Sequence, residues 1–335
     1  MTKSDKLRLV FMGTPDLAAV ILNKVLAWPQ GEVVAVYTQP DRPAGRGKHL
    51  QASPVKTLAL EHGLEIRQPL NFKNPADITA LAELKPDFLL VAAYGLILPQ
   101  AVLEVPRFAP VNVHASLLPK YRGAAPIQRA VMAGETETGI SIMRMEAGLD
   151  TGPVYAMRSI PISADDTAGT VHDALAGLGG LLLLETLPGI ASGEIRAVPQ
   201  DDNLATYAAK LSKADGQVNF NQAAQAVHDH VRGVSPWPGA WCELQRDAAQ
   251  GNSLVRVRVC PGRVADSSEI AILPAVSPGT VQGLIGNQLA IQCADGVYLI
   301  PQVCPAHRKM MGATEFACGY LNNAEACKAV GLDHG

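Results

Sequence analysis

Short apolar runs alternate with helix-like segments along the first hundred residues, and this alternation limits the folds that are open to the chain. Leu7 to Met12, Val33 to Tyr37 and Asp87 to Ala92 have the length and apolar content of buried strands. Apolar residues recur at helical spacing over residues 15–25, and Ser53-Pro54 is typical of a helix start. Strands that alternate with helices predict an α/β domain with a Rossmann-like parallel sheet.

The turn after the first apolar run bears on the kind of ligand. Gly13-Thr14-Pro15 predicts a helix with Thr14 as its N-cap and Pro15 in its first turn. The full G-x-G-x-x-G fingerprint of dinucleotide-binding proteins is missing from this turn. We therefore expect the Rossmann-like architecture without a nicotinamide cofactor.

The length of 335 residues predicts two domains. A first domain over residues 1–190 ends with a helix near 171–187, and a polar linker follows over 191–208. After a helical stretch near 223–231, the C-terminal domain (209–335) contains short strands that are separated by turn residues, at 255–259, 279–283, 289–292 and 296–301. This pattern predicts a small β-barrel.

Composition excludes several classes of protein. The chain is 48% hydrophobic and 18% charged, which is typical of a soluble globular protein. The apolar run that follows Lys3 and Lys6 is too short for a signal peptide or membrane span, so we expect a cytoplasmic protein without membrane contact. The six cysteines form no C-x-x-C pair, which predicts free thiols and no metal site: Cys242, Cys260, Cys293, Cys304, Cys318 and Cys327.

Three polar residues in the first domain can move an acyl group onto an amine. Asn112 and His114 stand two residues apart, so on an extended segment both side chains point to the same face. The Asn112 amide can donate a hydrogen bond to a developing oxyanion, and His114 can donate a hydrogen bond or exchange a proton. Asp150 can hold His114 in the required tautomer. The attacking amine is itself the nucleophile, so a catalytic Ser or Cys is not needed.

Five segments carry a family resemblance. Residues 112–126 read NVHASLLPKYRGAAP, and residues 139–152 read GISIMRMEAGLDTG. The other three are FMGTPD at 11–16, TQPDRPAGRGK at 38–48 and AYGLILP at 93–99. Together they resemble the formyltransferases that use 10-formyltetrahydrofolate, over roughly residues 7–240, and more weakly to the C-terminus. Ala115 stands where that family often has Gly, which changes no catalytic residue.

The resemblance implies both an activity and a set of site residues. It implies that Asn112, His114 and Asp150 are catalytic and that 10-formyltetrahydrofolate is the cosubstrate. The expected folate-binding residues lie in three motifs: Tyr94, Gly95, Leu96, Ile97, Ser116, Leu117, Leu118, Pro119 and Gly148. It also implies an OB-like barrel for the C-terminal domain. Ser116, Leu117 and Leu118 have a structural interpretation as well, in a turn or a core.

The five segments together indicate the branch of the family that formylates the α-amino group of initiator methionyl-tRNA. In that branch the 38–48 loop enters the acceptor stem, which implies tRNA contacts for Arg42, Arg46 and Lys48. Lys210 and Lys213 are further candidates for tRNA contacts. The net charge of −3 is unusual for a nucleic-acid reader, but the 38–48 loop carries a local charge of +2. An ordinary solvated loop is the alternative interpretation.

Other functions remain open on the sequence alone. Related formyltransferases act on glycinamide ribonucleotide or on an amino sugar nucleotide, or hydrolyse the formyl group. A noncatalytic RNA-binding protein with a degenerate enzyme domain is a further alternative. The long C-terminal extension disfavours the glycinamide enzyme, and the intact Asn112, His114 and Asp150 disfavour the noncatalytic protein.

Overall fold

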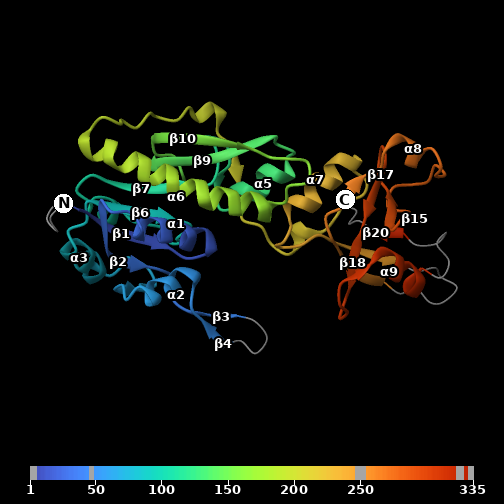
Figure 1. The fold of residues 1–335 in the computed structure, drawn as a ribbon, viewed down its shortest axis with the longest axis horizontal. Coiled ribbons are helices and arrows are strands. Elements are labelled where there is room, and N and C mark those ends of the chain that lie inside the picture. The colour runs from blue at the N-terminus through green and yellow to red at the C-terminus, as the bar shows by residue number, and fades with distance from the viewer. Residues whose placement is uncertain (1–5, 45–48, 246–253, 322–327, 331–335) are drawn as a thin grey trace. The chain divides into compact units, whose positions relative to one another are not determined.

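The computed structural model describes residues 6–44, 49–245, 254–321 and 328–330 (Figure 1). Two compact units are present: one contains residues 1–126, 137–161 and 172–208, and the other contains 127–136, 162–171 and 209–335. These units differ from the predicted domains at residues 127–136 and 162–171, which belong to the C-terminal unit, and at the predicted linker 191–208, which belongs to the N-terminal unit.

A seven-stranded sheet forms the centre of the N-terminal unit, in the order β10-β9-β7-β6-β1-β2-β5 among the described residues. The strands are β1 (Leu7–Gly13), β2 (Gly31–Tyr37), β5 (Ile66–Arg67), β6 (Phe88–Ala92), β7 (Ala109–His114), β9 (Glu137–Arg144) and β10 (Val154–Pro161). The five strands from β5 to β7 are parallel, and β9 and β10 extend the sheet with antiparallel pairing. The prediction of a Rossmann-like sheet is confirmed.

Helices cover both faces of this sheet (Figure 1). They are α1 (Asp16–Leu26), α2 (Pro54–Glu61), α3 (Pro75–Glu83), α4 (Gln100–Leu103) and α6 (Ala168–Ser192). A further helix, α5 (Pro126–Met132), belongs to the C-terminal unit except for its first residue. One core joins the sheet residues Val10 and Leu89 to Leu81 of α3 and Val102 of α4. On the other face α6 packs closely at Gly179, where an added Cβ would lie 2.9 Å from Cγ1 of Val113.

Helix α6 is long and apolar enough to cross a membrane by length and composition alone. More than half of its apolar window, 56%, is buried inside the protein. Leu175, Leu183 and Leu187 have no exposed surface. The burial identifies α6 as a core helix of the N-terminal unit.

Two predicted helix starts have different outcomes. Ser53 caps α2 as expected, because its hydroxyl accepts a hydrogen bond from the Lys56 amide at 3.0 Å. The prediction that Thr14 caps α1 is wrong. Pro15 occupies that position without a side-chain cap, and the Thr14 hydroxyl donates instead to the Tyr94 carbonyl at 2.9 Å.

Two short strand pairs lie outside the central sheet of the N-terminal unit. Within the 38–48 loop, β3 (Arg42–Ala44) pairs antiparallel with β4 (His49–Gln51), which follows the loop. Farther along the chain, β8 (Arg122–Gly123) pairs in parallel with β11 (Tyr207–Ala208). The second pair brings the end of the predicted linker next to the segment that follows His114.

Short strands dominate the C-terminal unit, as predicted, and those paired in its two sheets run antiparallel. Its elements are α7 (Ala224–Gly233), β12 (Trp241–Gln245), β13 (Leu254–Val259), β14 (Arg263–Val264), α8 (Ser267–Ile270), β15 (Val281–Ile285), β16 (Gln288–Gln292), β17 (Val297–Ile300), β18 (Gln302–Pro305), β19 (Met311–Gly312), α9 (Ala313–Tyr320) and β20 (Lys328–Val330). They form a five-stranded sheet, β19-β18-β13-β12-β20, and a four-stranded sheet, β14-β17-β16-β15. One core contains side chains of both sheets, such as Val257 of β13 and Ile291 of β16, together with Val231 of α7.

Candidate active site

Strand β7 places Asn112 and His114 on one side of the sheet. Alternation along the strand turns Val113 to the opposite side, against α6. The three parallel strands next to β7 end at the same edge, where sheets of this type bind their ligands. Asn112 and His114 are 9% and 6% exposed, so both are largely withdrawn from water yet still reach the surface.

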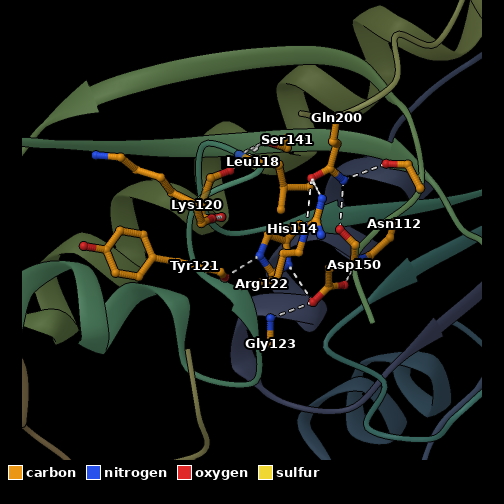
Figure 2. A network of polar contacts seen from close by, with 12 residues as sticks. Asn112, His114, Leu118, Lys120, Tyr121, Arg122, Gly123, Ser141, Asp150 and Gln200 are labelled. Atoms are coloured by element: carbon orange, nitrogen blue, oxygen red, sulfur yellow. Dashed lines mark hydrogen bonds and ion pairs between the residues drawn. The ribbon is translucent and has the colours of Figure 1, made fainter. Parts of the chain in front are cut away.

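Asp150 meets both side chains from the loop between β9 and β10 (Figure 2). Its Oδ1 lies 3.5 Å from Nδ2 of Asn112, and its Oδ2 lies 3.7 Å from Nδ1 of His114. The Gly123 amide donates to the same Oδ2 at 2.8 Å. The structure therefore brings Asp150 to Asn112 and His114, so all three predicted catalytic residues lie together although Asp150 is distant from the other two in sequence.

A backbone carbonyl selects the tautomer of His114. Nε2 of His114 lies 3.0 Å from the Tyr121 carbonyl oxygen. A carbonyl oxygen only accepts, so Nε2 carries the hydrogen in this contact. In neutral His114 the unprotonated Nδ1 then faces Asp150, which leaves that nitrogen as the atom able to take up a proton.

Asn112 and His114 are not locked by short hydrogen bonds to Asp150. Distances of 3.5 and 3.7 Å are longer than a good hydrogen bond. Catalytic contacts of this kind often tighten only when the reacting molecules are bound. The Asn112 amide can therefore turn its donor toward a developing oxyanion while the Asp150 carboxylate stays fixed by the Gly123 amide.

The predicted folate-binding residues 94–97 differ in their exposure to solvent. Tyr94 is 2% exposed and belongs to the core formed with α3 and α4, whereas Ile97 is 93% exposed. Burial raises the pKa of the Tyr94 hydroxyl, which stays protonated and has no hydrogen-bond partner among the described residues. The polar contribution of Tyr94 is thus its carbonyl, which accepts from Thr14 and from Gln39 at 2.9 Å each. Gly95 is exposed with a φ of 78°, and Leu96 is half-buried.

The segment 116–119 forms a tightly bonded turn after β7. The Ser116 hydroxyl donates to the Lys120 carbonyl at 2.6 Å, and Ser141 bridges the turn by accepting from the Leu118 amide and donating to the Ser116 carbonyl. Leu118 is buried in a small cluster with Met143 and Val154. Ser116 and Leu118 thus have the structural role considered above, while Leu117 and Pro119 are half-buried.

Gly148 lies exposed in the loop that carries Asp150. A Cβ at this position would meet the Thr151 hydroxyl at 2.1 Å, so a larger residue here would force the side chain of Thr151 to shift. The folate contacts of Gly148, of residues 94–97 and of residues 116–119 stay a prediction.

The predicted tRNA residues have less structural context. Arg42 is exposed on β3, where its guanidinium donates to the Gln39 side chain. Arg46 and Lys48 lie outside the described residues. Lys210 and Lys213 are exposed in the C-terminal unit. The Lys56 ammonium pairs with Asp41 at 2.7 Å and, by donating hydrogen bonds, lowers the pKa of that carboxyl. The one acidic residue of the 38–48 loop is thus neutralised by a cation outside the loop.

A cavity of about 710 Å³ opens where β1 and β2 end. Its polar lining includes Thr14, Asp16, Gln39, Arg42, Ser53 and Glu61. The cavity adjoins the predicted folate segment, because Thr14 and Gln39 both bond to the Tyr94 carbonyl.

Two residues of the site were missed by the sequence analysis. Arg122 is 2% exposed and donates to Gln200, which in turn donates to the backbone around Asp150. Arg122 lies inside one of the family motifs, so the motif itself was a signal for that residue. Gln200 lies in the polar segment that was predicted to be a linker, and its pattern gave no signal.

The described residues contain no group of three or more His, Cys, Asp or Glu that could hold a metal ion. Five of the six cysteines lie in the described part of the chain, and all five are free thiols. Cys242 and Cys293 are buried, and burial raises the pKa of each thiol to about 12. Cys327 lies outside the described residues.

Comparison with family models matches both parts of the chain. The model described as formyl transferase matches residues 7–187, and the model described as formyl transferase, C-terminal domain, matches residues 210–321. The N-terminal match includes Asn112, His114 and Asp150. The fold and the site thus define a formyltransferase, and the chain belongs to the formyl transferase family.

Relatives that are similar to the chain over nearly their whole length indicate its place within the family. A methionyl-tRNA formyltransferase of Nitratidesulfovibrio vulgaris (strain DP4) is 53% identical over 97% of this chain and 96% of the relative. A methionyl-tRNA formyltransferase of Desulfovibrio desulfuricans is 48% identical over 96% of this chain and 95% of the relative. Within the family, the chain belongs with the methionyl-tRNA formyltransferases.

Solved structures agree on the fold. An N-formyltransferase from Helicobacter canadensis, in complex with folinic acid and dTDP-3-aminofucose, has a TM-score of 0.62 at 16% identity and covers 88% of this chain and 98% of its own. HypX from Aquifex aeolicus, in complex with tetrahydrofolic acid, has a TM-score of 0.59 at 17% identity, over 95% of this chain and 48% of its own. At such identities the likeness concerns the fold alone.

Proposed function

We propose that the cluster of Asn112, His114 and Asp150 transfers the formyl group of 10-formyltetrahydrofolate to the α-amino group of initiator methionyl-tRNA. The observation that carries this proposal is the convergence of the three side chains beyond the end of β7. The similarity of the chain to methionyl-tRNA formyltransferases supports methionyl-tRNA as the formyl acceptor. Such an enzyme serves translation initiation in the cytoplasm.

The reaction needs a donor for negative charge and a route for a proton. Attack of the amine nitrogen on the formyl carbon places negative charge on the formyl oxygen, and the Asn112 amide stabilises this charge. His114, once protonated at Nδ1, donates to the same oxygen. Asp150 stabilises protonated His114 and orients it. The proton that leaves the attacking nitrogen goes to N10 of the folate as the bond from carbon to N10 breaks.

The acceptor requires little activation. An α-amino group has a pKa of about 7.7–8.0, so a useful fraction is unprotonated near neutral pH. Placement of the two substrates and stabilisation of charge therefore supply most of the rate enhancement. The buried setting of Asn112 and His114 strengthens the stabilisation of charge, because charges interact more strongly when water is excluded.

Substitution of Asn112 tests the assignment of the oxyanion donor. Asn112→Ala is expected to lower turnover by about 10²–10³-fold, because one oxyanion donor contributes roughly 3 kcal/mol. Binding of the folate, measured by calorimetry, is expected to be retained because the donor acts on transition-state charge. Asn23→Ala on the exposed side of α1 is the matched control. Near-normal turnover of Asn112→Ala would remove Asn112 from the mechanism.

We further propose that the 38–48 loop contacts the tRNA through Arg42, Arg46 and Lys48, and that Lys210 and Lys213 contribute from the C-terminal unit. The pairing of Asp41 with Lys56 supports this proposal, because the one acidic residue of the loop is bound to a cation outside the loop. An arginine can pair bidentately with a phosphate or with a base edge.

Arg46→Ala is expected to weaken productive binding of methionyl-tRNA and to leave binding of the folate unchanged. Loss of one phosphate contact makes the dependence on salt shallower, by a slope of about 1. Kinetics over a range of salt concentrations check this expectation. Arg158→Ala is a suitable control, because Arg158 is an exposed arginine on the edge strand β10. An unchanged KM for tRNA at physiological salt would show that the loop is only a solvated surface.

A further inference from the structure

The segment 198–208 is bonded to the active-site region at both of its ends. At one end, Val198 and Val154 exchange two backbone hydrogen bonds of 2.8 Å. At the other end, β11 pairs with β8, and the Thr206 carbonyl accepts from the Arg122 amide at 2.9 Å. The side chain of Gln200 is thereby held between two anchored ends.

The Gln200 amide uses its bonding capacity on the backbone around Asp150 (Figure 2). Its Nε2 donates to the Asp150 carbonyl at 2.8 Å and to the Gly152 carbonyl at 2.7 Å. Its Oε1 accepts from Nε of Arg122 at 3.1 Å and from a terminal nitrogen of Arg122 at 2.9 Å. Both amide hydrogens and the amide oxygen thus have partners, which fixes the orientation of the amide.

Arg122 is well placed to hold this amide still. It is 2% exposed, and it also pairs with the Asp202 carboxylate at 2.7 Å. A planar guanidinium buried between two acceptors offers few alternative arrangements. The next residue, Gly123, donates its amide hydrogen to the Asp150 carboxylate at 2.8 Å. Strand β8 therefore fixes Asp150 twice: directly at the side chain, and through Gln200 at the backbone.

Asp150 needs such support because of its backbone conformation. Its φ is 53°, in the left-handed region that residues other than glycine seldom adopt. The loop before it is exposed from Glu146 to Leu149, so packing constrains it little. A different φ at Asp150 would turn its carboxylate away from Nδ1 of His114.

We infer that Gln200 is a positioning residue for formyl transfer, which acts by holding the backbone of Asp150 so that its carboxylate faces His114. The inference rests on the proposed roles of Asp150 and His114. Gln200 itself touches no reacting atom; its effect on the reaction passes through Asp150.

Two substitutions separate positioning from a general structural role. Gln200→Leu keeps the approximate volume and removes every hydrogen bond of the amide. Gln200→Glu keeps an acceptor for Arg122 but places oxygen against the carbonyls of Asp150 and Gly152. Gln30→Leu is the matched control, because Gln30 is exposed at the amino end of β2, away from the site.

Both Gln200 variants are expected to lower kcat by about ten- to a hundredfold, because a misplacement of about 1 Å in a catalytic group can cost that much. For both variants, KM for methionyl-tRNA is expected to stay within about twofold of its value in the unsubstituted enzyme. The control Gln30→Leu is expected to keep the KM of the unsubstituted enzyme within the same limit. Gln200→Glu is expected to keep the folded structure, measured by circular dichroism, since its contact with Arg122 remains.

A double variant decides how Gln200 acts. If Gln200 works through Asp150, adding Gln200→Leu to Asp150→Asn lowers kcat by less than about twofold more. A full additional loss in the double variant would show an independent role and overturn the inference, as would unchanged kcat in Gln200→Leu and Gln200→Glu. Activity retained by Asp150→Asn itself would instead contradict the proposed function, so the two failures are distinguishable.

Discussion

Asp150 connects the predicted catalytic residues, because its carboxylate lies near both Asn112 and His114. Its carboxylate lies between Asn112 and His114 and is held by the Gly123 amide. A turn aspartate would commonly bond to its own backbone nearby. The contacts observed here reach residues 27 and 38 positions away in sequence, which favours the catalytic interpretation over the turn.

Asp150→Asn tests that interpretation. The substitution preserves volume and an acceptor for the Gly123 amide, so the fold is expected to survive. Turnover is expected to fall by about 10²-fold or more, because protonated His114 loses its counter-charge. Circular dichroism checks the fold, and turnover measured across pH checks the proton transfer.

The chain offers a matched control for this variant. His172 and Asp173 form another pair with 3.0 Å between Nδ1 and Oδ1, but Asp173 is 85% exposed. Asp173→Asn is expected to keep its activity. A turnover and pH profile for Asp150→Asn that match those of Asp173→Asn would reduce Asp150 to a loop residue.

Individual residues were predictable from the sequence where their signal is local. Asn112 and His114 share a strand, and Ser53 caps the helix that follows it directly. Gln200 and Thr14 were not predictable, because each bonds to residues that only the fold brings near: Gln200 to Asp150, and Thr14 to Tyr94. No local pattern shows that a glutamine in a polar segment or a threonine before a helix will have such a partner.

Among the secondary-structure elements, β7 and α6 together determine the geometry of the site. Val113 stands between Asn112 and His114 and points the other way, to Gly179 of α6. β7 and α6 can approach closely at Gly179 because glycine has no side chain. The packing of α6 is therefore connected to Asn112 and His114 through a single residue of β7.

Two glycines of α6 provide a matched test of this packing. Gly177→Ala meets no atom within 4 Å and is expected to stabilise the protein by up to about 1 kcal/mol, through helix propensity. Gly179→Ala places its Cβ 2.9 Å from Val113 and is expected to destabilise the protein by about 1–3 kcal/mol and to lower turnover. Urea unfolding and steady-state kinetics measure both effects. Equal stability of the two variants would show that α6 does not pack tightly on β7.

Elements were predictable where their pattern is long enough. The buried strands β1, β2 and β6 were evident as apolar runs, and α6 as a long apolar segment. The pair of β8 and β11 was not predictable, because each strand has only two residues and its partner is far along the chain. The segment that carries Asn112 and His114 was thus evident from the sequence, while the strand pair that supports Asp150 was not.

At the scale of the whole molecule, the N-terminal unit contains the proposed chemistry and the C-terminal unit contains a separate core of antiparallel strands. The family models match the two parts separately, with no match over residues 188–209. The boundaries predicted from the sequence treat each domain as continuous. In the structure, residues 127–136 and 162–171 belong to the C-terminal unit although residues of the N-terminal unit flank them in sequence. The sequence pattern of these segments does not show to which unit they belong.

The central claim is that the site beside β7 formylates methionyl-tRNA. Its most direct test supplies 10-formyltetrahydrofolate, labelled in the formyl group, to the purified protein with four acceptors in parallel: initiator methionyl-tRNA, elongator methionyl-tRNA, glycinamide ribonucleotide and an amino sugar nucleotide. We expect label to appear on the methionyl α-amino group, with initiator methionyl-tRNA as the preferred acceptor, and Asn112→Ala to abolish most of it. Label on the ribonucleotide or the sugar in preference to either tRNA, or undiminished transfer by Asn112→Ala, would contradict the account.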